Sequence, residues 1–314
     1  MSEKSQNLGL YRFAAATCWT TVLLLMVGAM VTSNQAGDSV PDWPLAYHRL
    51  IPPLVGGVRY EYSHRVVAGI VAIMTLILAI WISVADRRRQ VRRLGWNAFA
   101  LVIAQAVLGG LRVLDRDPAV LATAHAILAQ IFFILLVSLA LYLSPWWRGD
   151  LPRLEDSGSP RATAIAGWTT LIILAQLVLG AGYRHGAFGI VPHIIGAVVV
   201  GVFVVWVGRV IRKRFRSVPA LRKQVSYLHS AYGTQVLLGI AAYWGVVQLG
   251  ASLHPSEVYV GLTVAHVLVG ALTLATSLLL TLSCYRMIPS AKSAAFGSAS
   301  VPQHPAGASG KAGA

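Results

Sequence analysis

Apolar residues along the 314-residue chain gather in long blocks that short polar segments separate. A helix needs about 20 apolar residues to cross a hydrocarbon core of about 30 Å, and none of the blocks alternates as barrel strands do. We therefore predict eight transmembrane helices, over residues 12–33, 63–85, 94–112, 120–143, 163–183, 190–211, 226–249 and 257–284. The first block has no A-x-A-like cleavage site and reads as a retained helix.

The composition agrees with an all-α membrane protein. The chain is 56% hydrophobic and only 12% charged, with a mean hydropathy of +0.65, whereas a soluble domain is about 25% charged. The two cysteines, Cys18 and Cys284, both fall in predicted helices. We therefore expect no structural disulfide in the loops.

The net charge of +15 follows membrane topology and does not indicate nucleic acid. If the N-terminus is cytoplasmic, six arginines lie on the outer side, which leaves 20 of the 26 Lys and Arg residues on the inner side. This positive-inside pattern predicts a multi-pass protein of a bacterial-type plasma membrane with both termini in the cytoplasm. Membrane lipid is an expected partner of the basic loops. The outer arginines are Arg49, Arg59, Arg65, Arg112, Arg116 and Arg184.

A weak repeat divides the chain into two halves. "QAVLG" (105–109), "QLVLG" (176–180) and "QVLLG" (235–239) recur in odd-numbered helices, and "LLMVG" (24–28) stands at the matching place in the first helix. Close helix packing at glycine explains each copy taken alone. We predict two pseudo-symmetric four-helix bundles, residues 1–143 and 163–287, with a cytoplasmic linker (144–162) and a disordered tail (288–314).

Each even-numbered predicted helix carries one histidine in its outer half. A single membrane histidine usually reads as a polar residue satisfied by a neighbouring helix, but four at equivalent positions indicate a shared purpose. Within each half, two imidazoles on neighbouring helices can face one another across the bundle core. The four are His64, His125, His193 and His266.

Two facing imidazoles suit haem iron held between axial ligands. Zinc prefers three or four ligands, and a proton relay would want acids in mid-membrane. We therefore predict two bis-histidine haem sites, His64 with His125 and His193 with His266. Arg49, Arg59, Arg65, Arg112 and Arg184 are candidate partners for haem propionates. The remaining histidines have expected solvated or supporting roles, although His185 and His254 alternatively line a haem edge; the others are His48, His229 and His304.

The two halves differ at Glu61 in "RYEYSHRVVAG" (59–69), because Ile190 stands at the matching position before His193. One interpretation is a first-turn acid favoured by the helix dipole, or an ion pair with Arg59 or Arg65. The other is a catalytic acid/base or charge-stabilising group beside the first haem.

The motif Glu61-x-x-His64-Arg65, the "VPDWP" stretch (40–44) and the four spaced histidines resemble the haem A synthase family over about residues 10–285. The resemblance implies oxidation of the C8 methyl of haem O to a formyl group, giving haem A for terminal oxidase assembly. It implies that the first histidine pair holds the substrate haem, that the second holds a haem b passing electrons, and that Glu61 is essential. It also implies an electron donor such as a quinol, with haem O synthase or oxidase assembly factors as partners.

The first outer loop departs from many bacterial members, which carry a cysteine pair there. Its "HRLIPPLVGG" segment (48–57) is a candidate cover for the haem site. Two other functions stay open: a di-haem b, quinol-linked electron carrier, and a haem-delivery protein. Neither alternative explains why only one half carries Glu61.

Overall fold

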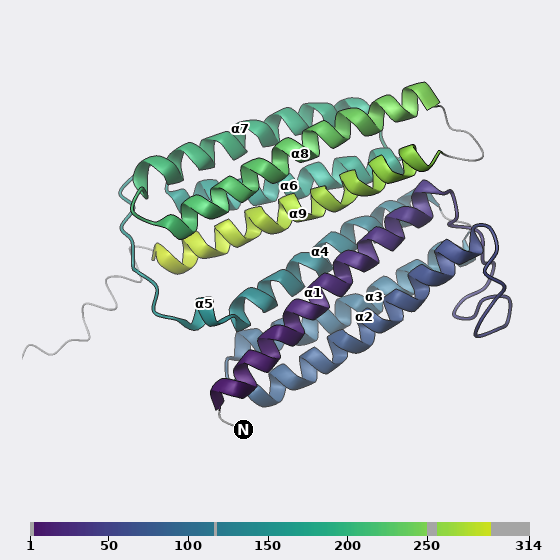
Figure 1. The fold of residues 1–314 in the computed structure, drawn as a ribbon, viewed down its shortest axis with the longest axis horizontal. Coiled ribbons are helices and arrows are strands. Elements are labelled where there is room, and N and C mark those ends of the chain that lie inside the picture. The colour runs from purple at the N-terminus through teal and green to yellow at the C-terminus, as the bar shows by residue number, and fades with distance from the viewer. Residues whose placement is uncertain (1–2, 116–117, 250–255, 290–314) are drawn as a thin grey trace, which may run out of the picture.

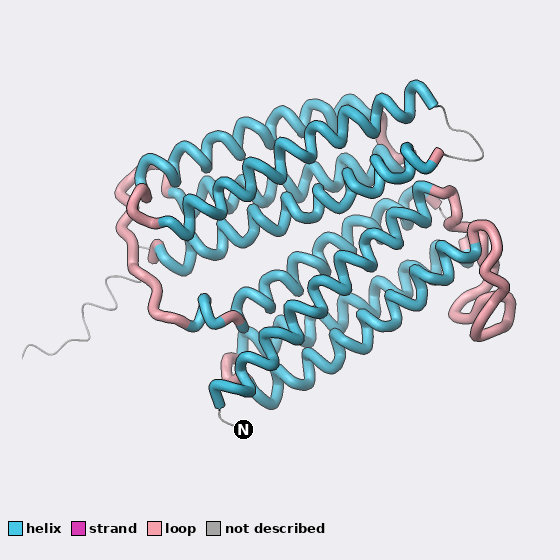
Figure 2. The backbone as a smooth tube through the Cα atoms, viewed as in Figure 1, coloured by secondary structure: helices cyan, strands magenta, loops and turns pink. Residues whose placement is uncertain are grey.

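The computed structural model describes residues 3–115, 118–249 and 256–289, and these residues form helices joined by loops (Figure 2). Arg116, His254, His304 and the predicted tail beyond residue 289 lie outside the described residues. The helices are α1 (Glu3–Ser33), α2 (Val58–Ala85), α3 (Arg89–Leu114), α4 (Ala119–Leu143), α5 (Pro145–Arg148), α6 (Ala162–Arg184), α7 (Ile190–Arg214), α8 (Pro219–Leu249) and α9 (Glu257–Met287).

Every predicted membrane helix corresponds to one long helix, which usually begins a few residues earlier than the apolar block. Seven of the described helices are long and apolar enough to cross a membrane: α1, α2, α3, α4, α6, α7 and α9. The long helix α8 is not among them. The chain is therefore an all-helical, multi-pass membrane protein in its described part, and the eighth span stays a prediction.

The long helices form two groups, with α1 to α4 in one and α6 to α9 in the other (Figure 1). Each group has its own buried core, to which all four of its helices contribute. Leu78 and Leu136 are fully buried in the first core, and Val204 and Leu274 in the second. The short helix α5 lies in the segment that connects the two groups, where the sequence predicted a linker.

Large apolar side chains also cover the outside of both groups. Ile73 on α2 is 61% exposed, Val202 on α7 is 60% exposed and Leu237 on α8 is 69% exposed. In water, so much exposed apolar surface would favour aggregation, whereas lipid chains solvate it. The exposed faces therefore agree with helices that stand in a bilayer.

The two groups touch along α1, α4, α6 and α9. Phe133 of α4 packs with Ala271 and Ala275 of α9, which are all buried. At the end where α1 finishes, the Ser33 and Thr263 hydroxyls lie 2.8 Å apart, at hydrogen-bonding distance. Arg184, the last residue of α6, donates to the Ala29 carbonyl at 3.0 Å and to the Ser33 hydroxyl at 2.7 Å. A charged side chain of the second group thus caps the end of a helix in the first.

At the opposite end of the first group, Asp86 follows the last residue of α2 and accepts hydrogen bonds from two arginines. Arg88 donates from Nε at 3.0 Å and from Nη2 at 2.7 Å, and Arg148 of α5 donates at 2.9 Å. Arg88 also donates to the Tyr142 carbonyl at 2.9 Å. This cluster ties the α2–α3 turn to the end of α4 and to the linker.

Candidate functional site

The four predicted histidines lie at one end of the molecule, within the first three turns of α2, α4, α7 and α9. The structure brings together the two pairs that the sequence predicted. The ring centres of His64 and His125 lie 6.4 Å apart, with their planes at 77°. The ring centres of His193 and His266 lie 6.3 Å apart, with their planes at 82°. Each pair bridges two helices of one group.

The ring separations agree with two axial ligands of one metal. A metal–imidazole bond is about 2.0 Å long, so two imidazoles that would hold one metal from opposite sides would have their ring centres about 6 Å apart. In the described part of the chain, no cluster of three or more His, Cys, Asp or Glu side chains is placed to hold a metal ion. A group that brings its own equatorial ligands, as haem does, needs only two from the protein.

Each imidazole packs against a glycine on the neighbouring helix. A Cβ added at Gly28 of α1 would lie 2.9 Å from Cε1 of His64, and one at Gly109 of α3 would lie 3.3 Å from Cε1 of His125. The corresponding distances are 2.8 Å from Gly180 to His193 and 2.9 Å from Gly239 to His266. A side chain at these positions would displace the imidazole, so the glycines leave the space that the rings occupy.

Three glutamines connect the same helices to the histidines. Gln105 donates to the His125 carbonyl at 3.0 Å, and Gln176 donates to the His193 carbonyl at 2.8 Å. The Gln176 amide nitrogen also lies 3.0 Å from Nδ1 of His193, and the Gln235 amide nitrogen lies 3.3 Å from Nε2 of His266. The glutamines therefore hold the histidine-bearing turns of three helices.

Several polar atoms at the two pairs are buried without a partner. They include Nδ1 of His64, His125 and His266, and the amide oxygens of Gln105, Gln176 and Gln235. Buried polar atoms are normally satisfied, so these atoms indicate a site built for a further group. Two imidazoles that face one another across a bundle fit haem ligation by their chemistry and spacing.

Glu61 lies in the first turn of α2, three residues before His64, and is 4% exposed. Its Oε1 atom accepts a 2.6 Å hydrogen bond from Nη2 of Arg65, and its Oε2 atom accepts a 2.9 Å hydrogen bond from the Val40 backbone amide. Of the two ion-pair partners that the sequence offered, the structure selects Arg65. Arg59 instead donates to the hydroxyl of Tyr60.

Arg65 also fastens the first outer loop to α2. Its Nη1 atom donates to the Asp42 and Leu45 carbonyls, each at 2.8 Å. Trp43 lies against Gly110 of α3, where an added Cβ would come within 2.6 Å of the indole. The "VPDWP" stretch thus lies beside Gly109 and the first histidine pair. The structure gives Arg65 a role in holding the loop, and its pairing with a propionate stays a prediction.

Two other predicted arginines stand at the same end. Arg112, in the last turn of α3, interacts electrostatically with both His64 and His125. Arg184 acts in the same way on His266, while its hydrogen bonds join it to α1. Arg65 also acts on His64, so the first pair has the guanidiniums of Arg65 and Arg112 nearby, and the second pair has that of Arg184.

The histidines outside the pairs have other surroundings. The side chain of His48 is 92% exposed in the outer loop, with its backbone amide donating to Asp42 at 2.8 Å. His185 ends α6. His229 lies in the N-terminal half of α8, with Nδ1 2.7 Å from the Val225 carbonyl. None of these three belongs to the two ring pairs.

Seven residues of the site were not predicted as site residues, although the repeat motif contains them. On the sequence alone, we interpret Q-x-x-L-G as a helix-packing motif. In the structure, its glutamine and its glycine contact the histidines. The repeat spacing was a usable signal, because glycine and histidine recur with the same helix order in both halves. The seven are Gly28, Gly109, Gly180, Gly239, Gln105, Gln176 and Gln235.

Comparison with known proteins agrees with this geometry. Residues 58–192 match the family COX15-CtaA, described as cytochrome oxidase assembly protein. A protein named haem A synthase from an Exiguobacterium species is 38% identical over 168 residues, covering 52% of this chain and 54% of that protein. The haem A synthase of Halalkalibacterium halodurans is 36% identical over 135 residues, covering 41% of this chain and 42% of that protein.

The haem A synthase of Lysinibacillus sphaericus is 33% identical over 182 residues, covering 55% of this chain and 57% of that protein. The chain thus spans about half the length of the curated relatives it matches. The matched segment 58–192 holds Glu61, His64, Arg65 and His125. This segment is therefore similar to the COX15-CtaA family of cytochrome oxidase assembly proteins.

Proposed function

We propose that this chain is a haem A synthase, an oxidoreductase that converts the C8 methyl of haem O to a formyl group and so supplies haem A for terminal oxidase assembly. The names of its relatives support this activity. The observation that carries the proposal is an asymmetry between two similar sites. Both hold a facing histidine pair, but only the first has a buried carboxylate one turn from its ligand.

We assign the first pair, His64 with His125, to haem O and its product haem A. The second pair, His193 with His266, holds a haem b. A bound haem b supplies one-electron transfer. The second pair has the same ring spacing as the first, but Ile190 stands where Glu61 would be. A histidine pair with no carboxylate three residues before either ligand suits an electron carrier better than a reaction centre.

Glu61 acts as a fixed negative charge in this proposal. Both of its oxygens accept hydrogen bonds, from Arg65 and from the Val40 amide, and this suits the ionised carboxylate. A buried carboxylate held in place stabilises positive charge that develops nearby during oxidation. A proton-accepting role would require one of these two donors to be displaced.

The proposed architecture has eight membrane spans, with α8 as the eighth, in two pseudo-symmetric bundles at 1–143 and 163–287. The matched glycine–histidine contacts in the two groups support this symmetry. The basic loops favour cytoplasmic termini, an orientation in which both histidine pairs would lie near the outer face. A quinol electron donor, haem O synthase and oxidase assembly factors are the proposed partners.

Haem extraction tests the activity directly. The full chain is co-expressed with a haem O supply, and its haems are extracted and separated by reversed-phase chromatography. Haem A or its hydroxylated precursor is the expected result. Folded protein that contains only haem B would overturn the synthase assignment in favour of a di-haem electron carrier. Unchanged haem O on folded protein would favour haem delivery.

A further inference from the structure

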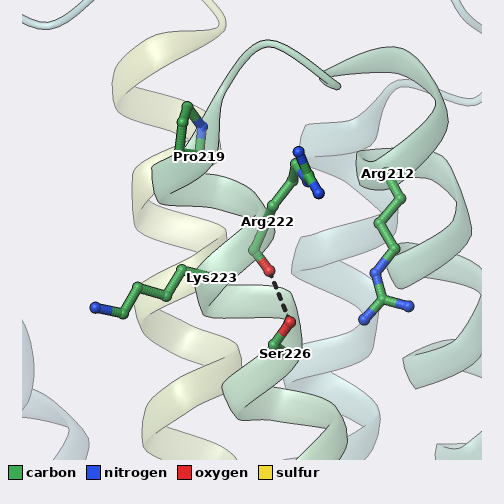
Figure 3. A pocket seen from close by; sticks show the side chains of 5 residues that line it. All are labelled: Arg212, Pro219, Arg222, Lys223 and Ser226. Carbon is green, nitrogen blue, oxygen red and sulfur yellow. Dashed lines mark hydrogen bonds between the residues drawn. The ribbon is translucent and has the colours of Figure 1, made fainter.

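Two arginine-rich pockets lie at the end of the helices opposite the histidine pairs. One, of about 490 Å³, lies between α7 and α8 and is lined by Arg212, Pro219, Arg222, Lys223 and Ser226 (Figure 3). The other, of about 380 Å³, lies between α2 and α3 and is lined by Ser83, Arg89, Arg92, Arg93, Trp96 and Asn97. Neither pocket belongs to the proposed haem sites.

The pockets occupy equivalent places in the two helix groups. Ser83 and Arg212 each follow the histidine of their helix by 19 residues. On the next helix, Arg92 and Arg222 each precede the histidine-contacting glutamine by 13 residues, and the neighbouring cations precede it by 12. Those neighbours are Arg93 and Lys223. Each half of the chain thus has two adjacent cationic residues at the equivalent position.

Within the described part of the chain, the pocket cations have no carboxylate partner. Arg92 and Arg222 each make one 3.4 Å hydrogen bond to a backbone carbonyl, and Lys223 lies 5.7 Å from the ring centre of Tyr227. Figure 3 shows Arg212 and Arg222 on facing helices, with Lys223 extending away from Arg212. Guanidiniums that line one pocket and have no carboxylate partner among the described residues suit a phosphate, which arginine binds with paired hydrogen bonds.

The position of the pockets along the helices indicates which class of phosphate compound they bind. Both begin where the membrane-spanning part of a helix ends, since α2 ends at Ala85 and α7 at Arg214. Trp96 is 45% exposed and donates from its indole to Ser83 at 3.0 Å. Tryptophan favours the interface between hydrocarbon and headgroups, and basic pockets between membrane helices bind acidic headgroups. We propose that each pocket binds the phosphate of an acidic phospholipid, one per helix group.

Native mass spectrometry of the purified full chain tests this proposal. Delipidated protein in detergent is titrated with phosphatidylglycerol, with phosphatidylcholine or with inorganic phosphate. The expected result is preferential binding of phosphatidylglycerol, which excess inorganic phosphate does not displace. Arg92→Gln or Arg222→Gln should each weaken binding at one site about fivefold, since a basic residue near the surface contributes on the order of 1 kcal/mol.

Arg12→Gln with Arg153→Gln is the matched control, because both arginines are exposed and lie outside the pockets. The control should bind lipid as the wild type does. Equal losses in control and pocket variants would overturn the proposal, as would equal binding of phosphatidylcholine. Displacement by inorganic phosphate would assign the sites to a free anion instead. If Arg222→Gln does not fold, Lys223→Gln tests the same pocket. The haem content does not enter this readout.

Discussion

Arg65 and Glu61 form a 2.6 Å ion pair one turn apart on α2, with side-chain exposures of only 16% and 6%. The same arginine binds two loop carbonyls. The carboxylate is therefore held between α2 and the first outer loop, and it cannot turn toward solvent without breaking the loop contact. A buried charge held by its partners is well suited to stabilise charge beside a bound substrate.

Glu61→Gln should abolish haem A formation while both haems still bind. The amide keeps the size of the side chain but loses the negative charge, and loss of one electrostatic stabiliser commonly costs about 10²-fold or more in rate. Haem A yield by chromatography and the Soret spectrum measure the two properties separately. Glu257→Gln is the control, because Glu257 is the first-turn acid of α9. Wild-type haem A production by Glu61→Gln would refute the catalytic role.

Gly239→Ala should reduce haem binding at the second site. The added methyl would lie 2.9 Å from Cε1 of His266, so the imidazole must move away from its ligating position. The haem-to-protein ratio should fall by about half if that axial ligand is lost. Gly233→Ala, in the same helix, meets no atom within 4 Å and should keep full haem content. Equal haem content in both variants would contradict the inference that Gly239 makes room for the His266 imidazole.

Asp86 should make stability depend on pH in the acid range. Burial alone raises the pKa of Asp86, but hydrogen bonds from Arg88 and the charges of Arg88 and Arg148 outweigh it and lower the pKa below its usual value. Its stabilising contribution is therefore complete above the unfolded pKa of about 3.9. It is lost as the pH falls through the lower folded pKa.

Asp86→Asn should lower the free energy of unfolding by about 1.5–3 kcal/mol at pH 7, because the amide has no charge and keeps only one of the two oxygens that accept from the arginines. Thermal unfolding in detergent between pH 7 and pH 3 measures this, and the difference between the wild type and the variant should shrink once the pH falls below about 3.9. Asp38→Asn, at an exposed loop position, should show no such difference. A gap between wild type and Asp86→Asn that stays constant with pH would rule out the ionic contribution.

Arg184→Gln should weaken the contact between the two helix groups. The substitution removes hydrogen bonds of 3.0 Å and 2.7 Å to Ala29 and Ser33 of α1, each worth about 1.5–3 kcal/mol when the donor is charged. A lower midpoint of thermal unfolding is the expected measurement. Arg59→Gln is the control, since Arg59 is exposed and bonds only to the adjacent Tyr60 within the described residues. A midpoint lowered equally in both would argue against a bridging role.

The length and the apolar character of the helices were readable from the sequence, because hydrocarbon thickness sets both. The predicted block 190–211 is helical in α7 (Ile190–Arg214), for example. The extension of α8 back to Pro219 was not readable, because polar residues at the membrane surface continue a helix as easily as they end one. The four histidines were found because the repeat places them at matching depths.

The sequence by itself determined the membrane helices, the histidine pairs and the isolated position of Glu61. Only the tertiary structure decided that Arg65, and not Arg59, binds Glu61. It also decided that Gly28, Gly109, Gly180 and Gly239 lie against the imidazoles. The contact of Arg184 with α1, which joins the two helix groups, likewise came only from the structure. Helical periodicity gives the direction of a side chain on its own helix. Which neighbour it meets depends on how the helices pack around one another, and sequence spacing does not contain that information.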